Sequence, residues 1–206
     1  GMTDLAYRLL LNEEYPGWLH EVKLGATTVW ERWNSLDENG RISSTGMNSL
    51  NHYSYGAVLE WIFRHVAGID VTEQGPGGKM MRISPKVDHK LGSASAVYDS
   101  ASGCYRCGWQ IENGDQITVT ITVPFGAKAQ VILPYAPDSV YHDTDNPLFE
   151  TVENGICCVK AGQYTVTYKA ASPLKKSYSV DSTLEDLLAE PAIRAFLSNM
   201  MEVDMI

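Results

Sequence analysis

Apolar residues along the first part of the chain recur at helical spacing. The segments "TDLAYRLLL", with Thr3 as a candidate cap, and "YPGWLHEVKLG", with Pro16 near its start and Gly25 after its end, each predict a short helix. Residues 48–66 predict a longer helix that stops at Gly68. Its apolar positions are Tyr55, Ala57, Val58, Leu59, Trp61, Ile62, Phe63 and Val66. They cover more than one stripe, so this helix is expected to have neighbours on more than one side.

After the turn-rich stretch "TEQGPGGK" the apolar pattern changes to strict alternation. Two runs of inward-facing apolar residues are separated by threonines and other polar residues: Ile117, Val119, Ile121 and Val123, then Ala129, Val131 and Leu133. The dipeptides Asn113-Gly114 and Asn154-Gly155 are typical of two-residue hairpin turns. Several short strands at close spacing, with no helices between them, predict an antiparallel β-sandwich.

The predicted fold class is α+β and multidomain. We expect a helical segment over 1–70, a β-sandwich over 71–174 and a helical tail over 175–206. In the tail, "STLEDLLAEPAIRAFLSNMME" predicts two short helices, with Ser182 or Thr183 as the first cap and Pro191 at the second start. The helices of the first segment are too few and too apolar to close a core by themselves, so this segment resembles the end of a larger helical domain.

The charge and hydropathy of the chain exclude two classes of partner. The 206 residues carry a net charge of −9, which argues against nucleic-acid binding, because that function needs a basic face to displace counterions from phosphate. No apolar run is long enough to cross a bilayer, and residues 1–20 lack the pattern of a secretory signal. We therefore expect a cytoplasmic protein without membrane contact. Gly1 is interpreted as a residue left by tag removal before a natural start at Met2.

Four cysteines at positions 104, 107, 157 and 158 raise the question of a metal or redox site. Cys157 and Cys158 are adjacent, so on a strand they would point to opposite faces and could not both complete one tetrahedral site. The favoured interpretation is that the thiols pack on strands in a reducing compartment. We expect neither a metal nor a cofactor.

Candidate chemistry centres on "LGATTVWERWNSLDENG", in which Trp30 and Trp33 bracket Glu31. Sugar rings lie on tryptophan faces, and a carboxylate nearby can take a proton from an attacking water. Alternatively, the tryptophans are core anchors and Glu31 pairs with Arg32 or caps a helix. Composition alone favours that second interpretation. His52, near Asn48, Asn51 and Tyr53, is similarly divided between ligand contact and structure, and Asp37 is interpreted as a turn residue.

Two blocks change this weighting, because they resemble a known family. "EYPGWLHEVKLGATTVWERW" and "GMNSLNHYSYGAVLEWIFRHVAGI" are similar to the C-terminal part of the catalytic domain of bacterial α-L-rhamnosidases, glycoside hydrolase family 78. "YDSASGCYRCGWQIENGDQITVTITVPFGAKAQVILP" resembles the β-sandwich that follows that domain, and the likeness extends over residues 3–170. The resemblance implies the end of an (α/α)6 barrel, inverting hydrolysis and a rhamnose-containing substrate. It implies Glu31 as general base, His52 as a rhamnose contact, and Trp30 and Trp33 as pocket wall or support.

The same resemblance implies an incomplete site. An inverting glycosidase also needs a general acid, and in the family that acid lies on earlier barrel helices, which this sequence does not contain. The main hypothesis is thus a C-terminal fragment of an α-L-rhamnosidase-like hydrolase, inactive alone. The alternatives are a non-catalytic carbohydrate-binding or scaffold protein, and a subunit that completes a barrel in trans. We expect either a homodimer or an upstream catalytic chain as partner.

Overall fold

The computed structural model describes residues 2–37, 39–44, 46–143, 145–174, 183–188, 193–197 and 199. The chain divides into two compact units, residues 1–174 and 175–206. In the second unit, α4 (Leu184–Leu188) is preceded by Thr183, whose carbonyl accepts a 3.0 Å hydrogen bond from the Leu187 N–H, and residues 193–197 are also helical. Ser182 and Pro191, the other expected helix starts of this tail, lie outside the described residues.

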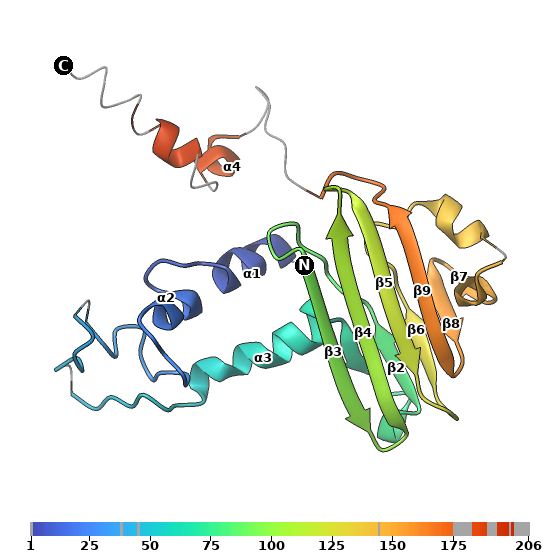
Figure 1. Cartoon of the computed structure of the whole chain (residues 1–206), viewed down its shortest axis with the longest axis horizontal. Helices are drawn as coiled ribbons and strands as arrows, with labels where there is room; N and C mark the ends of the chain where they lie inside the picture. Colours follow the sequence, from blue (N-terminus) through green and yellow to red (C-terminus); the bar gives the residue numbers. More distant parts are fainter. Residues whose placement is uncertain are drawn as a thin grey trace. The chain divides into compact units, whose positions relative to one another are not determined.

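The helical part of the first unit contains two short helices and one longer helical segment. The short helices are α1 (Thr3–Leu10) and α2 (Trp18–Lys23). The longer segment passes through a 3-10 turn, an α-helical turn and a π-helical turn: η1 (Ser54–Ala57), α3 (Val58–Trp61) and η2 (Ile62–Val66). It leads directly into the sandwich (Figure 1). Gly25 follows α2 and Gly68 follows η2, both with positive φ, as expected of residues that end helices.

The predicted helix over 48–66 begins later than expected, because residues 48–53 are not helical. Side-chain bonds compete with the helix there. One is local, from the Asn51 N–H to the Ser49 hydroxyl at 3.1 Å, and one is distant in sequence, from the Asn48 amide to the Ser35 carbonyl at 2.9 Å. The His52 N–H is also taken, since it donates to the Val29 carbonyl at 2.8 Å. Apolar spacing alone does not reveal these competing partners.

Two sheets form the predicted β-sandwich. The five-stranded sheet has the order β1-β2-β6-β8-β7 and the four-stranded sheet has the order β3-β4-β5-β9. In Figure 1 the four-stranded sheet is the front layer, with β2, β6 and β8 behind it. The strands of the first sheet are β1 (Ile69–Val71), β2 (Met80–Ile83), β6 (Lys128–Val131), β8 (Ile156–Val159) and β7 (Val152–Glu153). Those of the second are β3 (Ser93–Ser100), β4 (Gly103–Glu112), β5 (Gln116–Val123) and β9 (Gly162–Lys169).

All strand pairs are antiparallel except β2 with β6, which is parallel. The connections contain three 3-10 turns: η3 (Pro76–Gly78), η4 (Asp138–His142) and η5 (Pro147–Phe149). The sandwich expected to start at residue 71 includes all of β1, so its first strand follows the helical segment without a linker.

Both predicted hairpin turns are present. Asn113 and Gly114 have φ values of 52° and 82°, and Asn154 and Gly155 have values of 50° and 74°. Two successive positive φ angles define the turn type that matches strand twist, which is why Asn-Gly is favoured at these positions. The turns join β4 to β5 and β7 to β8.

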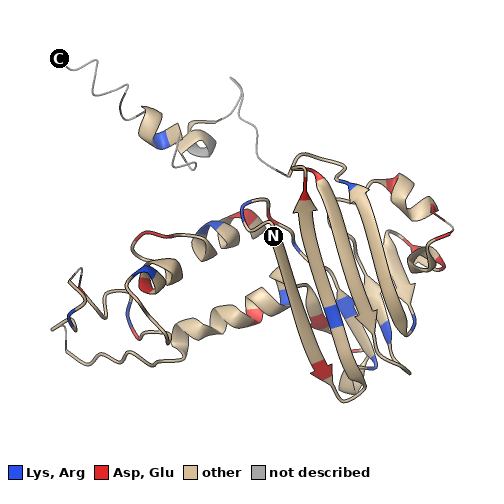
Figure 2. Ribbon diagram, viewed as in Figure 1, with Lys and Arg blue, Asp and Glu red and all other residues tan. Residues whose placement is uncertain are grey.

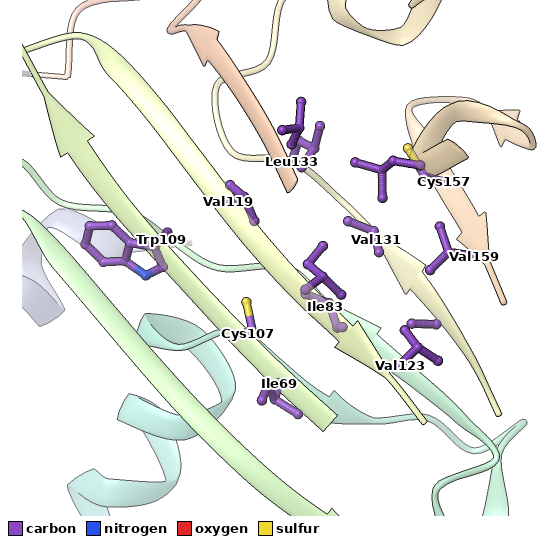
Figure 3. Close-up of a cluster of buried hydrophobic side chains, with 14 of the residues drawn as sticks. Ile69, Ile83, Cys107, Trp109, Val119, Val123, Val131, Leu133, Cys157 and Val159 are labelled. Carbon is purple, nitrogen blue, oxygen red and sulfur yellow. The ribbon is translucent and has the colours of Figure 1, made fainter. Parts of the chain in front are cut away.

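The core lies between the two sheets, where the labelled side chains of Figure 3 gather. The alternation read from the sequence is confirmed: every second residue of β5, from Ile117 to Val123, is buried. Cys157 and Cys158 point to opposite faces as expected, since the first is buried and the second exposed. Cys107 is buried in the same core.

The helical part shares this core, because α1 and the segment 54–66 pack onto the sandwich. The Trp109 indole N–H of β4 donates to the Val66 carbonyl at 2.7 Å, and the Tyr7 hydroxyl of α1 donates to the Lys86 carbonyl. Tyr7 also meets the Trp61 ring edge-on, at a centroid distance of 5.3 Å. These contacts fix the helical part against the edge of the sandwich.

Charged residues are dispersed over the first unit. Figure 2 shows Lys and Arg positions scattered among Asp and Glu positions, while most of the sheet carries neither. Among the described residues, no helix has both the length and the apolar character needed to cross a bilayer.

Candidate functional site

Two loops of the helical part run side by side and carry the candidate residues. The Glu31 N–H donates to the Ser49 carbonyl at 2.9 Å, and the His52 N–H donates to the Val29 carbonyl at 2.8 Å. The Thr28 hydroxyl adds a bond to the Leu50 carbonyl. Residues 28–31 and 49–52 therefore run antiparallel to each other, which places the Glu31 loop next to the His52 loop, although they come from separate sequence blocks.

The four candidates differ in burial. Glu31, Trp33 and His52 are half-buried, whereas Trp30 is only 2% exposed. Of the two roles implied for Trp30, its burial fits support and not an exposed pocket wall.

The His52 Nδ1 accepts the Ser54 N–H at 3.3 Å, so a neutral His52 ring carries its proton on Nε2. This nitrogen is then available as a donor.

Trp33 belongs to an aromatic cluster that links the two loops to α2. Its ring stacks on Tyr55 at a centroid distance of 4.0 Å and meets Trp18 edge-on at 5.2 Å. The Trp18 indole N–H in turn donates to the Tyr55 carbonyl at 3.1 Å. Trp18 and Tyr55 were not among the predicted site residues, although both lie within the two blocks that carry the family resemblance.

Ser35 and Asn48 tie the loops together beyond Glu31. The fully buried Ser35 hydroxyl donates to Asn48 Oδ1 at 2.6 Å, and Asn48 Nδ2 donates back to the Ser35 carbonyl at 2.9 Å. Asn48 is thus committed to structure and not to a ligand. Asp37 is a turn residue, as expected, because its Oδ1 accepts the N–H groups of Asn39 and Arg41 at 2.9 and 2.8 Å.

Glu21 of α2 is a buried carboxyl that sequence reasoning missed. Glu21 is 3% exposed, while the next residue, Val22, is 60% exposed. The polar residue is thus buried and the apolar residue exposed, which is the reverse of what residue polarity predicts. Glu21 Oε2 accepts the Trp30 N–H at 3.5 Å, and Oε1 has no hydrogen-bond partner among the described residues. Burial raises the pKa of the Glu21 carboxyl.

The arrangement offers a half-buried carboxylate, Glu31, and a half-buried histidine, His52, on two neighbouring loops. A carboxylate of this kind can accept a proton, and the Nε2–H of His52 can donate to a hydroxyl. Among the described residues, no group of three or more His, Cys, Asp and Glu side chains is placed to hold a metal ion. The chemistry that the site can perform is proton acceptance and hydroxyl recognition.

Two family models match consecutive parts of the chain. The model of the bacterial α-L-rhamnosidase six-hairpin glycosidase domain matches residues 1–66, and the model of the bacterial α-L-rhamnosidase C-terminal domain matches residues 68–146. The first match contains both candidate loops. The second begins at the glycine that separates the helical segment from β1.

Similar proteins share the name of that family. An α-L-rhamnosidase of Alteromonas sp. (strain LOR) is 39% identical over 80% of this chain, and one of Formosa agariphila is 37% identical over 75% of it. A solved α-L-rhamnosidase of Streptomyces avermitilis, complexed with L-rhamnose, superposes with a TM-score of 0.71 at 34% identity over 82% of this chain. The chain spans only 17%, 16% and 16% of these three proteins, respectively.

Proposed function

Because this chain belongs to the bacterial α-L-rhamnosidase family, as a C-terminal segment of it, we propose that it carries the general-base half of an inverting glycosidase site. The substrate would be a carbohydrate that contains rhamnose. The observation that supports this proposal most strongly is the antiparallel pairing of residues 28–31 with 49–52, which joins the loop of Glu31 to the loop of His52.

In the proposed reaction, the Glu31 carboxylate takes a proton from a water molecule as the water oxygen attacks the anomeric carbon. The bond from that carbon to the leaving oxygen breaks, and a general acid protonates the leaving oxygen. His52 donates from Nε2 to a hydroxyl of the sugar. Trp30 and Trp33 hold the Glu31 loop in place, the first as a buried side chain and the second within the aromatic cluster.

The second half of the site is proposed to come from other helices of a glycosidase barrel. In inverting enzymes the two carboxyl groups stand about 6.5–9.5 Å apart across the scissile bond. The described helical part consists of α1, α2 and the segment 54–66, and Glu31 is its proposed base. We propose that an upstream chain, or a partner in trans, supplies the acid, so that this chain alone is inactive.

Exposed apolar side chains support such a partner. On the segment 54–66, Leu59 is 63% exposed and Phe63 is 37% exposed, although both lie on a helix that resembles part of a closed barrel. Further hairpins packed against this surface would bury these residues and bring the acid toward Glu31.

A chimera tests the role of Glu31. Residues 2–174 replace the matching segment of the Streptomyces avermitilis enzyme, and hydrolysis of an aryl α-L-rhamnoside is measured for the chimera and for the isolated chain. We expect no turnover by the isolated chain. In an active chimera, Glu31→Gln should lower kcat by about 10²–10⁴-fold, the usual size of a general-base contribution.

The matched control is Glu60→Gln, which removes an exposed carboxylate paired with Arg64 at 2.8 Å and should leave kcat unchanged. Equal activity of the Glu31→Gln and unmodified chimeras would refute the general-base proposal. It would favour the alternative of a non-catalytic carbohydrate-binding or scaffold protein. Turnover by the isolated chain that depends on Glu31 would refute the need for a partner.

We also propose a cytoplasmic location. All four cysteines are free thiols, and Cys104 and Cys107 face opposite sides of β4, so they cannot pair with each other. Free thiols are typical of a reducing compartment.

A further inference from the structure

Glu21 is a buried ionisable group that the proposed reaction does not use. It lies in α2, its side chain is 3% exposed, and Oε1 has no hydrogen-bond partner among the described residues. A leucine would fill similar space without the cost of burying a carboxyl group. What leucine lacks is an acceptor for the Trp30 N–H.

A single peptide group connects Glu21 to both candidate residues. The peptide between Val29 and Trp30 points its N–H at Glu21 Oε2, at 3.5 Å, and its carbonyl at the His52 N–H, at 2.8 Å. Glu31 follows directly in the sequence, and its own N–H donates to the Ser49 carbonyl. A rotation of the Val29–Trp30 peptide would therefore displace Glu31 and His52 together.

The main chain of α2 contributes to the same attachment. The Glu21 carbonyl accepts the Ala26 N–H at 3.0 Å, which binds the start of the loop to the helix that also supports its end. Because burial favours the neutral acid, the carboxyl can remain buried without an opposite charge and still accept a hydrogen bond.

We propose that Glu21 is a positioning residue that fixes the Val29–Trp30 peptide and thereby holds Glu31 and His52 in register. The identification of those two residues as the site rests on the proposed function, whereas the hydrogen-bond geometry does not. Glu21 touches no substrate in this proposal and acts only through the peptide.

Amide hydrogen exchange of the full chain, followed by NMR, tests the proposal with two variants of similar volume. Glu21→Met removes the acceptor and fills the space, whereas Glu21→Gln keeps an acceptor oxygen without a charge. In Glu21→Met we expect exchange at the Trp30 and His52 amides to accelerate about two- to tenfold, the effect of losing one hydrogen bond. Glu21→Gln should return both rates to within about twofold of the unmodified chain.

The controls separate positioning from general loss of stability. The Val119 amide in the sandwich core should exchange equally in all variants, and so should all three amides in Glu13→Gln, which removes an exposed carboxylate bound to Lys23 at 2.8 Å. Unchanged Trp30 and His52 rates in Glu21→Met would overturn the proposal, as would failure of Glu21→Gln to restore them or an equal acceleration at Val119.

The unmodified chain provides a test that needs no variant, because a Trp30 amide that exchanges as fast as that of an unstructured peptide would also overturn the proposal. No sugar is present in these measurements, so they can fail while the chimera succeeds, and the reverse.

Discussion

Glu21 and Glu31 carry the same carboxyl group on adjacent segments, but the fold gives them different environments. Glu21 is buried within α2 and Glu31 is half-buried on the loop that follows. The cysteines show a similar contrast within one residue type, since Cys107 and Cys157 lie in the core and Cys158 is exposed. Reactivity at the residue scale should therefore follow burial and not residue type.

The thiols allow a direct check of this rule. Burial raises the pKa of Cys107 to about 12 and that of Cys157 to about 11, so at pH 8 almost none of either is present as the reactive thiolate. In a titration with a thiol-specific disulfide reagent, Cys158 should react first, and Cys107 and Cys157 should react only when the chain unfolds. Cys158→Ser should remove the fast phase. Rapid modification of Cys107 in the folded chain would contradict the assignment.

At the scale of elements, the helical segment 54–66 and β1 meet at Gly68. Its φ is +83°, and a Cβ at this position would lie 2.3 Å from the Pro85 nitrogen. The Gly68 carbonyl accepts the Ser84 N–H at 2.8 Å, so a hydrogen bond also ties this connection to the residue before Pro85. Gly68 thus lets the chain turn sharply from helix to strand where no other side chain fits.

Replacing this glycine should weaken the join between helices and sandwich. Gly68→Ala adds the cost of a left-handed residue and of overpacking against Pro85, together about 2–5 kcal/mol of unfolding free energy. Gly25→Ala is the control, because its φ is +87° but no atom lies within 4 Å of an added Cβ. It should cost only about 1 kcal/mol. Urea denaturation measures both, and equal losses would show that the contact with Pro85 carries no cost.

Much of this fold could be predicted from the sequence, because local patterns determine it. The short helices, both Asn-Gly turns and the alternation of β5 follow from residue spacing. The non-helical stretch 48–53 could not be predicted in this way, since its hydrogen-bond partners, Val29 and Ser35, are distant in sequence. Motifs indicated Glu31 and His52, but the buried support from Glu21 depends on a contact that spacing does not encode.

At the scale of the whole molecule, one hydrophobic cluster includes Tyr7 of α1, Val66 of the helical segment and the sandwich core. This shared core covers one side of the helices. Other apolar side chains of the helical part stay exposed: Val22, Ile42, Met47, Tyr53 and Leu59. The chain therefore buries part of the apolar surface of its own helices, and the remaining apolar surface is available for association.

We expect the purified chain to self-associate through this surface. Size-exclusion chromatography with light scattering should give a molar mass above the 22.8 kDa of one chain, and Leu59→Glu should lower it toward that value. Phe125→Glu is the matched control, because Phe125 is an exposed aromatic residue in a sandwich turn. A strictly monomeric, non-aggregating solution of the unmodified chain would rule out this association.

The parallel pairing of β2 with β6 also has a consequence for the order of folding. Strands β3, β4 and β5 are neighbours in sequence and in space, so they can form hairpins early, whereas β2 and β6 lie on either side of those three strands in the sequence. Closing such a loop is slower than closing a hairpin. The helical segment joins the sandwich through β1, which pairs with β2. We therefore expect pulse-labelling during refolding to protect the β4 and β5 amides first, and the loops that carry Glu31 and His52 to become ordered on a sandwich that is already built.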